Sequence, residues 1–112
     1  MKGENVEVSR EAIATLAAQA ACQVPGVVSC YRSPVDSLAS RVKREFVHKG
    51  IKVENLEGAY RLGVHLRVEY GTNLPALARE VREKVREYLE GLTDVKVEEV
   101  EVVIEDVEPP PP

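Results

Sequence analysis

The stretch "YRLGVHLRVEYGTNLPALAREV", residues 60–81, changes from one hydrophobic periodicity to another at a single glycine. Before that glycine, apolar residues occupy every second position, the pattern of a strand with one buried face. The predicted buried set is Tyr60, Leu62, Val64, Leu66, Val68 and Tyr70. After it, apolar residues recur at helical spacing from Leu74 to Leu92. The stretch therefore predicts a strand that leads directly into a helix.

The junction Gly71-Thr72-Asn73 raises the question of a ligand loop, because glycine loops between a strand and a helix can hold phosphate. Such loops use several glycines and several backbone N–H groups. Here one glycine stands alone, and Pro75 removes one N–H donor. We predict that the junction is a capped turn, with Asn73 as N-cap and Pro75 in the first helical turn.

The neighbouring segments complete the C-terminal part of the chain. Ile51 and Val53 begin a strand, and Glu57-Gly58 supplies a hairpin turn toward residue 60. Gly91 is the predicted end of the helix. The valine-rich segment 94–108 is the predicted last strand. Its apolar parity shifts from Val95 and Val97 to Val100, Val102 and Ile104, which predicts a bulge near Glu98-Glu99.

The N-terminal part predicts one more strand and two helices. Val6 and Val8 alternate with polar residues and form a short first strand. Ser9 caps an alanine-rich helix that stops at Pro25-Gly26, and its small side chains predict heavy burial. The segment "SPVDSLASRVKREFVHKG", residues 33–50, predicts a second, shorter helix that ends at Gly50.

Together these elements predict a two-layer α+β domain over residues 1–108, followed by a disordered proline tail at 109–112. The simplest closure is a four-stranded, mainly antiparallel sheet with two main helices on one face. This is the ferredoxin-like βαββαβ arrangement, here with a short basic helix added. A related two-layer fold with another strand order stays open.

Composition and motifs limit the function classes. The chain has 112 residues and a net charge of −4, so nothing global favours nucleic acid. No apolar run approaches the roughly 18 residues of a membrane span, and the polar start is no signal peptide, so we expect a cytoplasmic protein. Cys22 and Cys30 are predicted to be free thiols. No zinc spacing, serine elbow or Walker loop is present, so we expect no metal, no cofactor, no catalytic residue and no enzyme.

Two surfaces are candidates for partner binding. Residues 32–52 carry six Lys or Arg against two acidic residues, and the predicted partner-binding cations are Arg41, Lys43, Arg44 and Lys49. Such a patch meets an acidic partner or anionic lipid in a salt-sensitive way. The alternative surface is the polar face of strand 60–70, with Arg61, His65 and Arg67. That face keeps an RNA-binding module open, although Tyr60 and Tyr70 share the parity of the buried residues.

Three segments resemble a known family. They are "VPGVVS" (24–29), "KGIKVE" (49–54) and above all "VEYGTNLPALAREVREKVREYLEGLTDVKVEEVEV" (68–102). Their order and spacing resemble the alkaline shock protein family, also called the Gls-type envelope stress response family. The resemblance runs from about Val6 to Val107. The chain departs from the pattern in its proline tail and in the basic stretch "RVKREFVHKG" (41–50).

The resemblance implies a small, non-enzymatic bacterial protein of the cell-envelope stress response. Some members of the family sit at the membrane through an anchoring partner, and others are linked to lipid synthesis. The family has no catalytic motif to transfer. We therefore expect an adaptor or scaffold that binds a protein partner, in particular a membrane-anchored one, at the inner membrane surface, without inserting into the membrane itself. A homo-oligomer is left open.

Overall fold

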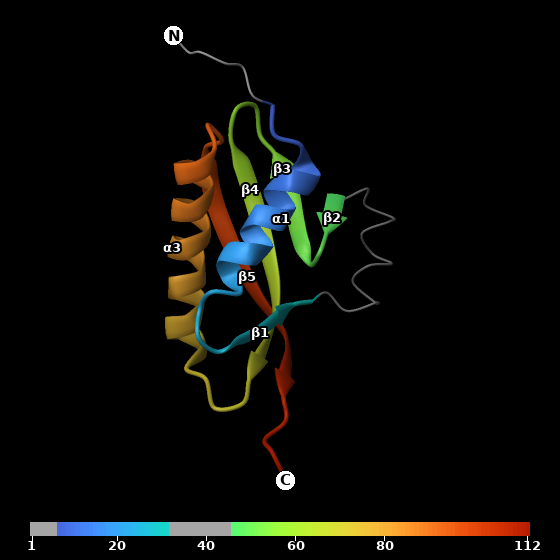
Figure 1. Ribbon diagram of the computed structural model, residues 1–112, viewed down its shortest axis with the longest axis vertical. Coiled ribbons are helices and arrows are strands. Elements are labelled where there is room, and N and C mark those ends of the chain that lie inside the picture. The colour runs from blue at the N-terminus through green and yellow to red at the C-terminus, as the bar shows by residue number, and fades with distance from the viewer. Residues whose placement is uncertain (1–6, 32–45) are drawn as a thin grey trace.

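The computed structural model describes residues 7–31 and 46–112 and has the predicted α+β class. Its elements are α1 (Arg10–Ala21), β1 (Val27–Cys30), β2 (Phe46–His48), β3 (Ile51–Asn55), β4 (Tyr60–Glu69), α3 (Leu74–Leu92) and β5 (Val97–Glu108). The five strands form one sheet, and both helices lie on the same face of it (Figure 1). The fold is therefore two layers, one of helices and one of strands.

Strand β4 is the centre of the sheet. Along one edge it pairs antiparallel with β3, where Val64 lies opposite Ile51, and with β1, where Leu66 lies opposite Cys30. The two short strands thus lie end to end against one long strand. Along its other edge β4 pairs in parallel with β5 over the full length from Tyr60 to Glu69. Strand β2 pairs with the outer edge of β3.

The predicted ferredoxin-like arrangement is not confirmed, because the strand order is β1-β4-β3-β2 with β5 beside β4. Among the described residues, Glu7 and Val8 belong to no strand; Val6 lies outside that range. Val8 instead packs against the core as part of the chain leading into α1, so its apolar side chain is partly buried without strand pairing. The strand that precedes β2 follows α1: Gly26 adopts φ 100° and leads the chain into β1, which sequence analysis missed.

A helix was predicted over residues 33–50. Residues 33–45 lie outside the described ranges, and for residues 46–50 the prediction is wrong. Phe46–His48 is a strand, joined to β3 by the two-residue turn Lys49-Gly50. Both turn residues have positive φ, 54° and 78°, as a tight hairpin requires. Phe46 and Val47, an aromatic and a β-branched residue, are of the types that favour strands.

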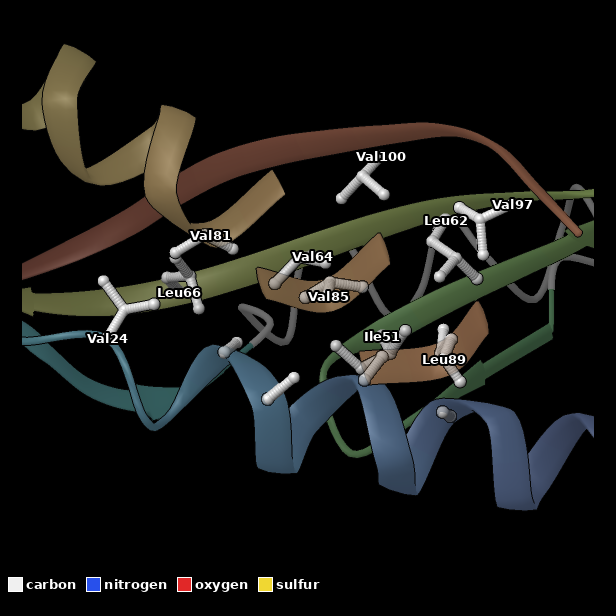
Figure 2. Packing of buried hydrophobic residues seen from close by; sticks show 14 of the residues in the cluster. Val24, Ile51, Leu62, Val64, Leu66, Val81, Val85, Leu89, Val97 and Val100 are labelled. Carbon is white, nitrogen blue, oxygen red and sulfur yellow. The ribbon is translucent and has the colours of Figure 1, made fainter. Parts of the chain in front are cut away.

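The core lies between β4 and the two helices. Leu62, Val64, Leu66 and Val68 are completely buried, as their alternation predicts. Figure 2 shows the labelled side chains of β4 facing those of α3, namely Val81, Val85 and Leu89. On α1 the buried positions are one isoleucine and four alanines, Ile13, Ala14, Ala17, Ala20 and Ala21. The small side chains let α1 approach the sheet closely, which confirms the predicted heavy burial.

The junction after β4 is the capped turn that the sequence predicts. The side chain of Asn73 accepts a hydrogen bond from the N–H of Ala76 at 3.0 Å, and Thr72 Oγ1 donates to the carbonyl of Glu69 at 2.8 Å. Gly71 supplies the positive φ of 90°. Helix α3 then carries the chain back along the sheet, which is why β5 runs parallel to β4.

The ends of elements differ from prediction in detail. Helix α3 continues past Gly91 and ends at Leu92, with Thr93 as its C-cap. The hydroxyl of Thr93 donates to the carbonyl of Leu89 at 2.7 Å. Tyr70 lies beyond the end of β4 and is 66% exposed, so its predicted burial is wrong. The predicted bulge is confirmed, because the partners of Tyr60 and Arg61 are Val97 and Glu99, which leaves Glu98 as the extra residue.

Leu66 tests the core assignment. It is completely buried on β4, so Leu66→Ala should lower the free energy of unfolding by about 2–5 kcal/mol. Leu92 is 60% exposed at the end of α3, so Leu92→Ala serves as the matched control and should change stability little. Denaturant melts of both variants check this, and equal destabilisation would contradict the packing described.

Asn73 tests the junction. Asn73→Ala removes the cap acceptor for Ala76 and should lower stability by about 1 kcal/mol. Asn73→Asp keeps a side-chain oxygen and should melt close to the original chain. The comparison needs only thermal denaturation of the three proteins. If the aspartate variant is as unstable as the alanine variant, the cap is not what Asn73 contributes.

Candidate interaction surface

The face of the sheet opposite the helices carries the predicted residues Arg61, His65 and Arg67. We call it the open sheet face. Neither helix covers it, since both lie on the other face (Figure 1). The strand registers place these residues on it: Lys52, Glu54, Arg61, Gly63, His65, Arg67, Glu99, Glu101, Val103, Glu105 and Asp106.

The two arginines of this face lie beside carboxylates of neighbouring strands. Arg61 contacts Glu54 of β3 at 3.4 Å and Glu99 of β5 at 3.1 Å. Arg67 Nε lies 3.3 Å from a carboxylate oxygen of Asp106, but it makes no hydrogen bond, so this contact is purely electrostatic. All five side chains are between a third and two thirds exposed. Each pair therefore contributes at most about 1 kcal/mol and can exchange partners easily.

His65 is held differently from the arginines. Its Nδ1 lies 2.6 Å from a carboxylate oxygen of Glu105, and the two side chains are only 11% and 9% exposed. The contact depends on a second bulge: Leu66 and Arg67 pair with Ile104 and Asp106, which leaves Glu105 as an extra residue. A bulge redirects a side chain, and here it brings Glu105 to His65. Sequence analysis missed this partner, because parity alone does not show the second bulge.

The open sheet face is acidic rather than basic. Three of its residues are cationic, Lys52, Arg61 and Arg67, whereas five carry carboxylates, Glu54, Glu99, Glu101, Glu105 and Asp106. The strand sequence suggested a cationic face because the anionic residues come from β3 and β5. The structure thus brings the predicted residues together and surrounds them with opposite charge.

The structure places one residue of the predicted basic patch, and the partner-binding role of the patch stays a prediction. Lys49 is exposed in the turn between β2 and β3, not on a helix. Arg41, Lys43 and Arg44 lie outside the described residues, and their predicted role stays a prediction.

Cys22 and Cys30 are free thiols, as predicted. Cys22 is exposed at the end of α1, whereas Cys30 is partly buried on β1, its sulfur 4.0 Å from the carbonyl of Ala18. Burial, together with the charge of Cys22 and a hydrogen bond to it, raises the pKa of Cys30 to about 12. Within residues 7–31 and 46–112, no group of three or more potential ligands could hold a metal ion.

No helix in the described part of the chain is long and apolar enough to cross a membrane.

Comparison with protein families gives a match over nearly the whole chain. The model of the alkaline shock protein 23 family, described as having a cell envelope-related function, matches residues 1–109. The chain belongs to this family. The expected resemblance is therefore confirmed, and with it a role related to the cell envelope.

Two curated relatives are similar over most of the chain. Protein YqhY of Bacillus subtilis is 27% identical over 99 residues, which cover 88% of this chain and 73% of YqhY. Protein Spy1614 of Streptococcus pyogenes is 24% identical over 104 residues, which cover 91% of this chain and 86% of Spy1614.

Solved structures share the fold of this family member. A D-to-A variant of the MamM CTD has a TM-score of 0.56 at 18% identity and covers 89% of this chain and 100% of its own. A C-to-S variant of the same domain has a TM-score of 0.54 at 18% identity and covers 88% and 96%. At this identity the likeness concerns the fold alone.

The two thiols should differ in reactivity. The thiolate is the nucleophile, and a pKa raised from 9.0 to about 12 reduces the thiolate fraction of Cys30 at pH 8 by roughly a thousandfold. Alkylation with iodoacetamide, followed by mass spectrometry, should therefore modify Cys22 first. Cys22→Ala removes two of the three causes but not burial, so Cys30 should still react slowly in that variant. Equal rates at the two cysteines would contradict the described burial.

Proposed function

We propose that this protein is a non-catalytic adaptor of the cell envelope that binds a protein partner through its open sheet face. The observation that supports this most is the face itself, a surface that neither helix covers, with a dense array of charges of both signs on a rigid sheet. Its charge pairs are partly exposed and can be exchanged for groups of a partner. Complementary charge of this kind gives specificity and fast association.

The excess of carboxylates indicates the chemistry of the partner. A surface with five acidic and three basic residues attracts a partner that presents more Lys and Arg than Asp and Glu. Arg61, His65 and Arg67 then hold the carboxylates of this face in place and can contact an acidic group of the partner.

Family membership supports a site at the cell envelope. We propose that the partner is membrane-anchored and holds the adaptor at the inner face of the cell membrane, and a link to lipid metabolism follows the same resemblance. The absence of catalytic activity and the predicted patch at Arg41, Lys43 and Arg44 stay predictions within this proposal.

RNA binding through the same face is the weaker alternative. Arg61 lies beside Glu54 and Glu99, and Asp106 lies beside Arg67, so a phosphate backbone would meet carboxylates at each cation. Tyr70 is exposed but lies beyond the end of β4 and not within the paired strand. Sheet-type RNA readers need aromatic rings on the exposed face itself.

Charge reversal at matched positions tests the proposal. The tagged full chain is incubated with membrane and soluble extracts, and bound proteins are identified by mass spectrometry. Glu54→Lys with Glu101→Lys reverses two charges on the open sheet face, and we expect it to lose the protein that the original chain captures.

Glu83→Lys with Glu87→Lys is the control, because it changes the net charge equally on the exposed surface of α3. It should retain the partner. Equal capture by both variants would place the interface elsewhere, and nuclease-sensitive capture would favour the RNA alternative.

A further inference from the structure

The outer edge of β5 is unpaired in the part of the chain that the structure describes. Strand β5 runs over 12 residues and pairs with β4 on one side only, so it forms one border of the sheet (Figure 1). A long free edge presents backbone N–H and C=O groups that another strand can bond.

The hydrogen bonds of β4 show which residues of β5 face outward. The backbone groups of His65 point away from β5: its N–H donates to the carbonyl of Gly50, and its carbonyl accepts from the N–H of Tyr31. The backbone N–H and C=O groups of successive strand residues point toward opposite neighbouring strands. The even-numbered residues of β4 therefore form their backbone hydrogen bonds with β5. In a parallel pair, the residue opposite a bonding residue directs its own N–H and C=O away. The outward-facing residues of β5 are therefore Val97, Val100, Val102, Ile104 and Val107.

Hydrogen bonds at the first and last of these residues confirm that their backbone groups point outward from the sheet. The N–H of Val97 donates to Glu90 of α3 at 2.9 Å, and its carbonyl lies 3.5 Å from Nε of Arg86, so neither group bonds β4. The N–H of Val107 donates to the carboxylate of Asp106 at 3.0 Å. Side chains thus occupy the two ends, whereas Val100, Val102 and Ile104 between them have no backbone partner beyond the sheet edge among the described residues.

The side chains beside this edge define what can pair with it. Val100, Val102 and Ile104 lie on the core face, next to the helices. Glu99, Glu101 and Glu105 lie on the open sheet face. A strand added here would therefore place every second side chain beside apolar residues and the others beside Glu99, Glu101 and Glu105, with Val103 between the last two.

A second copy of the same edge does not fit this requirement. Residues 97–108 contain six carboxylates and no Lys or Arg, so two such strands would bring like charges together. Acidic edges of this kind oppose self-association. Charge complementarity instead selects a cationic segment.

We propose that Val100–Ile104 of β5 binds an extended partner segment that alternates apolar residues with Lys or Arg and extends the sheet by one strand. The inference rests on the proposed adaptor function and names the site and the chemistry of its partner. Backbone hydrogen bonds to the three outward-facing residues supply affinity, and the alternation supplies specificity.

Proline substitutions distinguish a loss of binding at this edge from a loss of stability of the fold. The backbone donor that Val102→Pro removes is an outward N–H, a loss that edge strands tolerate, whereas Val103→Pro removes an N–H that bonds β4. We expect Val102→Pro to fold and Val103→Pro to melt at a lower temperature. Val102→Ala keeps the N–H and is the control for the lost side chain.

The probe is a short synthetic peptide that alternates valine and lysine, measured by calorimetry against the full chain. Binding should weaken by at least about tenfold in Val102→Pro and stay close to the original in Val102→Ala. Amide hydrogen exchange at Val100, Val102 and Ile104 of the original chain should slow when the peptide is added, a readout that does not depend on the proline variant folding.

Several results would overturn the proposal. They are no binding of the peptide, binding that Val102→Pro leaves unchanged, equal binding of a peptide that alternates valine and glutamate, or a dimer of the chain that Val102→Pro dissociates. If the proline variant still captures the membrane partner that Glu54→Lys with Glu101→Lys loses, the adaptor function stands and the strand-addition site is wrong.

Discussion

The whole architecture depends on the alternation of β4. Its even-numbered side chains enter the core, and the same residues direct their backbone toward β5. Its odd-numbered side chains form the open sheet face, and their backbone bonds β1 and β3. One ten-residue strand therefore fixes the hydrophobic layer, the polar layer and the order of its neighbours at once. A shift of its register by one residue would exchange the two faces completely.

Local signals were enough to predict most elements of the C-terminal part. The alternation of residues 60–68, the turn at Glu57-Gly58, the Asn73 cap and the bulge at Glu98 are all encoded within a few residues of one another. Non-local pairing could not be predicted in the same way. Strand β1 has four residues and is stable only because the distant strand β4 pairs with it. Strand β2 has three residues and pairs with β3 across a two-residue turn. Phe46–His48 was predicted as part of a helix, but pairing with β3 makes these residues a strand.

Of the candidate surface, the residues of β4 could be predicted from the sequence, but their partners on neighbouring strands could not. Strand parity places Arg61, His65 and Arg67 on one face, but the carboxylates that change the sign of that face come from β3 and β5. Their positions depend on strand order and on a bulge, neither of which the periodicity of a single strand reveals. The free edge of β5 likewise depends on the direction of individual backbone hydrogen bonds, which the periodicity of a sequence does not show.

The two bulges of β5 restrict how the chain length of this strand can vary among related sequences. Loss of a paired residue would move the following valines onto the polar side. Glu98 and Glu105 have no paired residue in β4, so deletion of either one leaves the register of the other pairs unchanged. The two positions are nevertheless unequal. The carbonyl of Glu98 only accepts a hydrogen bond from Arg86, whereas loss of Glu105 leaves a buried imidazole without its carboxylate. Deletions in this strand should therefore be tolerated at the first bulge and selected against at the second.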